Sequence, residues 1–222
     1  GDMQSEFAES ANVTIGVSVK LPYENSIHSE ELFDQLTVID ANNDKSTWTF
    51  DSGYEAATYK YNAENAGDDW LVSPAVNMKK NAAYKFSFDA VNTYPIERVA
   101  AAVGLAPTAE ALTEEIVAPT DITADPRRHP LTGTNRAKED GQHNFGIHCV
   151  SEANQSTLYV DNMMITEVPA TAPEVPANFK VVPGDKGASY ANISVQAPTT
   201  TITRAALSGN VQLKLFRDGT NI

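Results

Sequence analysis

Alternating apolar and polar residues along the chain predict β-strands. The run 13–20 alternates throughout, and the segment around residue 86 places Tyr84, Phe86 and Phe88 on one face. A further apolar strand is predicted at Leu158–Ile165. Clusters of turn-forming residues separate these runs, at 42–44, 66–69, 138–141 and 183–185. Short strands with frequent turns favour an all-β sandwich over a fold of alternating strands and helices.

One short helix is expected within this β pattern. Thr108 follows Pro107 and can cap a helix over 109–115, where Glu110 lies near the positive end of the helix dipole. A helix of this length would decorate a loop between two strands.

A change in composition divides the chain after residue 167. The segment 168–176 contains Pro169, Pro173 and Pro176, which predict an extended, semi-rigid linker. Such linkers join modules that fold independently. We therefore expect an N-terminal segment or strand at 1–20, a first domain at 21–167, this linker, and a second domain at 177–222.

Composition and charge narrow the function further. Of 222 residues, 41% are hydrophobic, which is enough for a packed core. The formal net charge of −13 repels phosphate, so we expect no nucleic-acid partner. No apolar run reaches the roughly 20 residues that span a bilayer. Excess carboxylates do attract calcium ions.

The single cysteine is expected to be a buried and inert thiol. Phe145, Ile147 and Cys149 share one face at period two, whereas the neighbouring His148 points to the other face of the strand. A nucleophile activated by His148 is therefore a poor geometric proposal. With one cysteine, an intramolecular disulfide is impossible.

Motifs in a fixed order resemble the cleaved-adhesin or "choice-of-anchor J" family, whose relatives form the haemagglutinin-adhesin regions of gingipain-type proteases. The motifs are the opening Leu21–Asn25, the block Phe33–Phe50 with its IDANND sequence, the DDWLVSP sequence at 68–74, the strand Tyr84–Ala90 and the closing strand at 159–162. The resemblance implies a jelly-roll, galactose-binding-like sandwich in a secreted bacterial protein.

The remaining residues resemble the start of a fibronectin type III domain. In this chain, residues 178–183 resemble strand A of that family, residues 190–198 resemble strand B, and residues 211–218 resemble strand C. A complete sandwich of this kind takes about 100 residues. The resemblance therefore implies a truncated second sandwich, continued by further chain or stabilised by packing against a neighbour.

A candidate calcium site lies between two of these motifs. Asp40, Asn42 and Asp44 carry oxygen ligands at alternate positions of a tight loop and can converge on a hard cation. Relatives in the resembling family often bind calcium in this region, which implies that Asp161 of the closing strand approaches the same ion. The alternative is an Asn/Asp-rich turn whose side chains hydrogen-bond to their own backbone.

A carbohydrate site is the second candidate. Tyr54, Tyr59, Tyr61 and the loop residue Tyr94 could stack on sugar rings, with His129 on the same rim. The alternative is that these tyrosines pack half-buried along strands.

Signs of catalysis are few in the sequence. The four histidines are scattered, and the chain has no G-x-S-x-G motif, phosphate-binding glycine loop or C-x-x-C motif. We therefore expect no enzyme activity.

The resemblance implies an extracellular adhesion or ligand-binding module of a larger bacterial surface protein. Its partner would be a glycan or a protein on a host or neighbouring cell. The alternative is an accessory module that targets carbohydrate, or serves as a spacer, for a secreted protease or glycoside hydrolase. A purely structural spacer ranks third.

Overall fold

Nearly all regular structure in the chain is β-strand. The computed structural model describes residues 18–185, 190–217 and 220–221, and its one helix among these is the four-residue α1, Glu30–Phe33. No helix in these ranges is long and apolar enough to cross a membrane. The strands are β1 Tyr23–Asn25, β2 Thr37–Asp40, β3 Thr49–Asp51, β4 Ala56–Lys60, β5 Asp69–Val72, β6 Val76–Met78, β7 Ala83–Gly104, β8 Glu114–Arg136, β9 Gly141–Cys149, β10 Thr157–Val168, β11 Ala177–Pro183, β12 Ala191–Gln196, β13 Phe216–Arg217 and β14 Thr220–Asn221.

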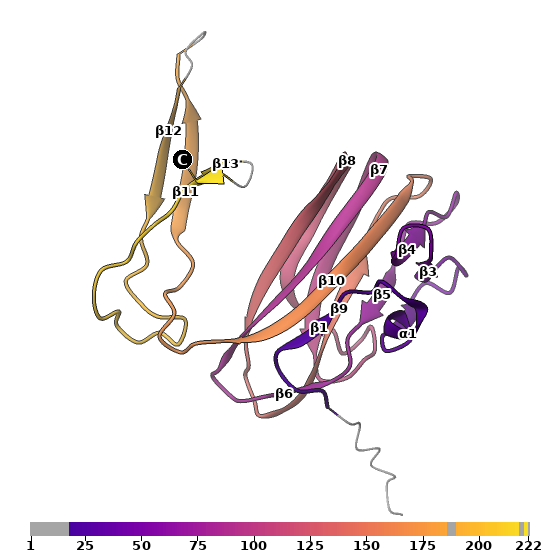
Figure 1. Cartoon of the computed structure of the whole chain (residues 1–222), viewed down its shortest axis with the longest axis horizontal. Coiled ribbons are helices and arrows are strands. Elements are labelled where there is room, and N and C mark those ends of the chain that lie inside the picture. The colour runs from indigo at the N-terminus through magenta and orange to yellow at the C-terminus, as the bar shows by residue number, and fades with distance from the viewer. Residues whose placement is uncertain (1–17, 186–189, 218–219, 222) are drawn as a thin grey trace, which may run out of the picture.

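Ten of these strands form one curled antiparallel sheet that folds over on itself. Its strand order is β2-β5-β9-β7-β10-β4-β3, with β8 on β7, β1 on β10 and β6 on β9. Figure 1 shows the long strands β7, β8 and β10 running side by side. This arrangement is a jelly-roll β-sandwich, which confirms the fold class predicted for the first domain.

The long strand β7 belongs to both layers of the sandwich. Its first half, 83–92, pairs with β10, and its second half, 99–104, pairs with β9. Strand β8 pairs with β7 along both halves. Because β10 leads to β4 and β3 while β9 leads to β5 and β2, the curl of β7 places the two layers face to face.

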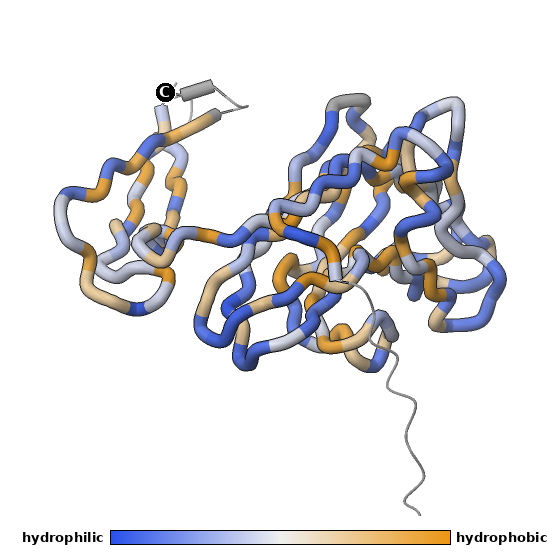
Figure 2. Tube along the Cα trace, turned by 60° about the horizontal axis from the view of Figure 1, so that its bottom comes forward, coloured by the Kyte–Doolittle hydropathy of each residue, from blue (hydrophilic) through white to orange (hydrophobic). Residues whose placement is uncertain are grey.

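The core lies between these two layers. From β7 it receives Tyr84, Phe86 and Phe88, which are at most 1% exposed, as their period-two pattern predicted. Trp48 is buried in the same cluster. Figure 2 shows short hydrophobic and hydrophilic stretches following one another along the tube of the sandwich.

A smaller apolar cluster covers the outer face of the β5–β9 layer. Trp70 and Val72 pack there against Leu112, which comes from the loop between β7 and β8. The helix predicted at 109–115 is wrong: the loop makes a single turn, in which the Thr108 carbonyl accepts from Ala111 and Leu112, and β8 begins at Glu114. Pairing with β7 and burial of Leu112 outweigh the weak capping signal.

The C-terminal region is a hairpin beside the sandwich, as Figure 1 shows. Strands β11 and β12 fall on the predicted strands A and B, but of the predicted strand C only Phe216–Arg217 is a strand among the described residues. The hairpin exposes an apolar face, with Phe179 60% and Ile193 42% exposed. The fibronectin type III resemblance stays a prediction. Of the strand predicted at 13–20, residues 13–17 lie outside the described residues, while Val19 bridges Val76.

We expect the β7 core face to govern stability. Phe86→Ala removes a ring that contacts Phe88 and Phe145, and should lower the free energy of unfolding by about 3–5 kcal/mol in urea titrations. The control Ile96→Ala, on the same strand but 43% exposed, should cost less than about 1 kcal/mol. Equal losses for the two variants would contradict the proposed core.

Candidate functional site

The structure brings three of the four predicted calcium ligands together. Asp40, Asn42 and Asp44 lie in the loop that follows β2. Asp40 accepts hydrogen bonds from the backbone amides of Asp44 and Lys45, at 3.1 and 2.9 Å, and Asp44 accepts from the amide of Ser46 at 2.8 Å. These bonds close the loop as an Asn/Asp turn, the geometry of the predicted alternative.

Side chains outside the loop also bind it. Asn62 donates to Asp44 Oδ2 at 3.0 Å, and Asn42 donates to the Ala66 carbonyl at 2.9 Å. The loop is thereby tied to the segment that leads into β5. Calcium would have to displace some of these N–H donors from the carboxylate oxygens.

A buried carboxyl group outside the predicted ligand set lies next to this loop. Asp69, paired with Asp40 across β2 and β5, is 0% exposed, and its Oδ1 has no hydrogen-bond partner. Burial raises the pKa of Asp69 to about 6, and the negative charges of Asp40 and Asp44 add to this. None of the three carboxylates takes part in an ion pair among the described residues. The cluster therefore carries negative charge that no ion pair among the described residues compensates.

Asp161 does not join this cluster. It lies on β10 opposite Asp89 of β7 and forms an ion pair with Arg128 of β8. Within the described ranges no three His, Cys, Asp or Glu side chains converge to hold a metal. The predicted set of four ligands is therefore not assembled in this structure.

The four predicted tyrosines separate into different environments. Tyr59 is 1% exposed and packs against Trp48 in the core, so it is buried more deeply than the half-buried packing of the predicted alternative. Tyr61 is 45% exposed. The side chain of Tyr94 lies outside the described residues. Tyr54 is 59% exposed and its ring lies against that of Tyr159, with centroids 4.3 Å apart.

This Tyr54–Tyr159 pair forms an aromatic surface on the outer face of the β4–β10–β7 layer. Leu158 and Val160 point into the core, so Tyr159 between them points outward. Tyr54 is held by the turn between β3 and β4, where Asp51 accepts from the amides of Gly53 and Tyr54 at 2.8 and 3.2 Å. The rings are thus presented by a rigid strand and a hydrogen-bonded turn.

Tyr159 belongs to the closing strand motif at 159–162 and was not among the predicted ligand residues. The outward position of its ring follows from the inward positions of its neighbours, a signal that was available in the sequence. Partial burial raises the pKa of Tyr159 to about 12, with a further contribution from Tyr54, so its hydroxyl stays protonated near neutral pH.

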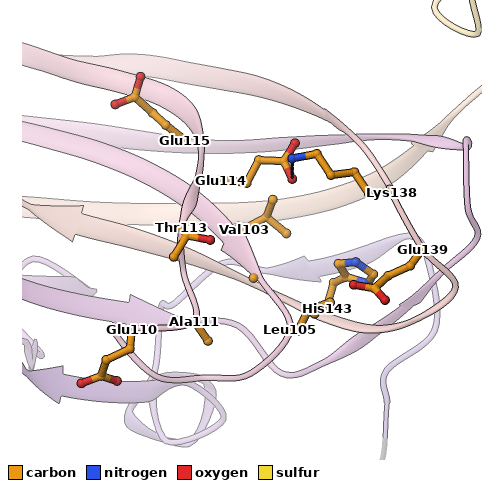
Figure 3. Close-up of a pocket in the computed structure, with 11 residues that line it drawn as sticks. Val103, Leu105, Glu110, Ala111, Thr113, Glu114, Glu115, Lys138, Glu139 and His143 are labelled. Atoms are coloured by element: carbon orange, nitrogen blue, oxygen red, sulfur yellow. Dashed lines mark ion pairs between the residues drawn. The ribbon is translucent and has the colours of Figure 1, made fainter.

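A concave cleft of about 560 Å³ lies where β7 ends and β8 begins (Figure 3). Carboxylates dominate its lining, from Glu110, Glu114, Glu115 and Glu139, and Lys138 pairs with Glu114 at 3.1 Å. Its described lining includes no Phe, Tyr or Trp ring. The cleft therefore offers charge and hydrogen bonds but no surface on which a sugar ring could stack.

The cysteine is buried, as predicted. Cys149 is 0% exposed, and burial raises the pKa of its thiol to about 12, so it stays protonated at neutral pH. His148 points away from it, stacks on Trp70 and lies 2.7 Å from Asp68. This geometry offers no nucleophile at Cys149.

The pKa of Asp69 predicts how stability depends on pH. Folded Asp69 holds its proton up to about pH 6, while the unfolded carboxyl loses it near 3.9. The protein should therefore lose stability as pH rises from about 4 to 6, and Asp69→Asn should flatten this slope in chelator-treated samples. Melting curves across this range test it. The exposed control Asp34→Asn should keep the slope, and an unchanged slope in Asp69→Asn would refute the assignment.

Comparisons with known proteins bear on the fold. No family model and no curated protein matches the sequence. Among solved structures, the K1 cleaved adhesin domain of Lys-gingipain from Porphyromonas gingivalis W83 is similar with a TM-score of 0.51 and 15% identity, covering 66% of this chain and 98% of that domain. The K3 cleaved adhesin domain of the same protein has a TM-score of 0.46 and 15% identity, covering 60% of this chain and 91% of that domain. The CBM22-1 xylan-binding domain from Paenibacillus barcinonensis Xyn10C has a TM-score of 0.43 and 14% identity, covering 66% of this chain and 93% of that domain.

At such identities the similarity to the K1 domain shows the fold alone. The expectation drawn from the ordered sequence motifs is confirmed at that level: the sandwich is a jelly roll of the cleaved-adhesin type.

Proposed function

We propose that this chain is a non-catalytic binding module of an extracellular bacterial surface protein, and that it recognises glycans through the Tyr54–Tyr159 pair. The observation that carries the proposal is an aromatic pair on the outer face of the sheet, in which Tyr54 is exposed and Tyr159 is half-buried. Aromatic faces stack on the apolar faces of sugar rings, and Tyr supplies a polar hydroxyl at the edge of the ring. Strand and turn hold both rings in place before the ligand arrives, which lowers the entropic cost of binding.

The other surfaces support this choice of site. The acidic cleft lacks a stacking ring, and Tyr61 is exposed without a ring partner among the described residues. The outer face of β10 combines the aromatic pair with the charged side chains of Asp161, Asp89 and Arg128. Sugar recognition needs both kinds of contact.

We further propose that calcium stabilises the loop at Asp40–Asp44. Asp40 and Asp44 would hold the ion together with the carbonyl oxygen of the Asn42 side chain, next to the orphaned carboxyl oxygen of Asp69. These are hard oxygen ligands of the kind that calcium prefers. The ion would neutralise the negative charge of these carboxylates, which form no ion pair with a basic side chain among the described residues. Its role would be to rigidify the loop between β2 and β3.

The glycan proposal predicts a loss of binding on removal of one ring. Tyr54→Ala should weaken the affinity for array-identified oligosaccharides by about tenfold or more, measured by calorimetry, because a stacking contact is lost. The matched control Tyr61→Ala removes a similarly exposed tyrosine and should bind like the parent protein. Absence of any signal on a broad glycan array, or equal losses in the two variants, would contradict the proposal.

The calcium proposal predicts a shift in melting temperature. Adding calcium to chelator-treated protein should raise the melting temperature by several degrees, because a ligand that binds only the folded state stabilises it. Asp44→Asn should abolish the rise, whereas Asp34→Asn should retain it. An unchanged melting temperature in the parent protein would reduce the loop to a self-bonded turn.

A further inference from the structure

Charged side chains continue the outer face of β10 directly beyond the aromatic pair. Tyr159 and Asp161 are two residues apart on one strand, so their side chains project on the same side about 7 Å apart along it. Asp89 lies directly opposite Asp161 on β7, and side chains in such positions lie within contact distance. The face thus runs from two rings to two facing carboxylates.

Arg128 completes this arrangement from a third strand. It belongs to β8, which pairs with β7 on the side away from β10, yet its guanidinium forms an ion pair with Asp161. Its side chain therefore reaches across β7 over the outer face, and it remains 47% exposed. A guanidinium carries five N–H donors, so Arg128 has donors beyond the one that Asp161 uses.

The hydrogen bonding of the two carboxylates is incomplete. Asp161 is 4% exposed and its Oδ1 has no hydrogen-bond partner, although Oδ2 is paired with Arg128. Asp89 Oδ2 accepts from Asn162 Nδ2 at 2.9 Å. A buried carboxylate oxygen without a donor is rare in folded proteins, so Asp161 Oδ1 can accept a hydrogen bond from a donor outside the chain. Sugar hydroxyls are donors of this kind.

We infer that Asp89, Asp161 and Arg128 form the polar half of the glycan site, and that this half selects neutral oligosaccharides over uronates. The inference rests on the proposed glycan-binding function and names the class of glycan. Two carboxylates against one guanidinium leave this half negatively charged, and Asp51 below Tyr54 adds a further negative charge. The carboxylate of a uronate is repelled here, whereas the hydroxyls of a neutral sugar donate to Asp89 and accept from Arg128.

Calorimetry with chain-matched oligosaccharides tests this selection. Cellohexaose and xylohexaose serve as neutral probes, and hexagalacturonate as the anionic probe. We expect at least one neutral probe to bind the full chain about tenfold or more tightly than hexagalacturonate. Asp89→Asn removes a negative charge with little change of shape and should narrow this ratio several-fold. Arg128→Lys keeps the positive charge but loses the planar guanidinium with its paired donors, and should lower the affinity for the neutral probe.

Controls separate this inference from the function on which it rests. Glu167→Gln changes an exposed charge at the far end of β10 and should leave the ratio unchanged. Suppose that the probes bind and that Tyr54→Ala removes this binding. Hexagalacturonate bound as tightly as the neutral probes, or an affinity ratio unchanged by Asp89→Asn, would then overturn this inference alone. Failure of all three probes to bind would overturn the proposed function and this inference together. Circular dichroism spectra of each variant confirm that it is folded.

Discussion

The structure depends on the pairing of β7 with three other strands. Its outer edge is fully occupied by β8, and its inner edge is shared by β10 and then β9. Every other strand of the sandwich is attached through β10 or β9. Because a strand buries one face at period two, the same pairing also decides which side chains of each layer reach the core and which reach solvent.

Both candidate sites are consequences of the register in which neighbouring strands pair. Asp40 and Asp69 meet because β2 and β5 pair residue by residue, and Asp89 meets Asp161 because β7 pairs with β10. A slip of one residue would move each carboxylate to the other face of its strand. The pairing of the strands therefore sets the positions of these carboxylates, without any attraction between the carboxylates themselves. Their electrostatic repulsion is a cost that the packed core offsets.

The sequence allowed the strands, the buried faces and the jelly-roll class to be predicted, because period-two alternation and turn residues are local signals. The position of Cys149 and of the ring face of β7 follow from that alternation alone. The segment at 109–115 could not be predicted correctly, since the pairing of Glu114 and Glu115 with β7 and the burial of Leu112 are tertiary contacts that local capping signals do not report. The partners of Asp161 depend on register in the same way: its place beside Arg128 required knowing that β8 lies on the far side of β7.

The central place of β10 in the sandwich has a consequence for the order of synthesis. This strand is formed by residues 157–168, yet it is the only link from β7 to β4 and β3, and it also pairs with β1 near the start of the described chain. Until residue 168 has left the ribosome, the first half of β7 has no partner on its inner edge, and β1 and β4 lack the strand that joins them to β7. Such long-range closure is slow and leaves strand edges open to other chains. Two unfinished chains can therefore pair through these edges, so the late position of β10 in the sequence exposes the chain to association during synthesis.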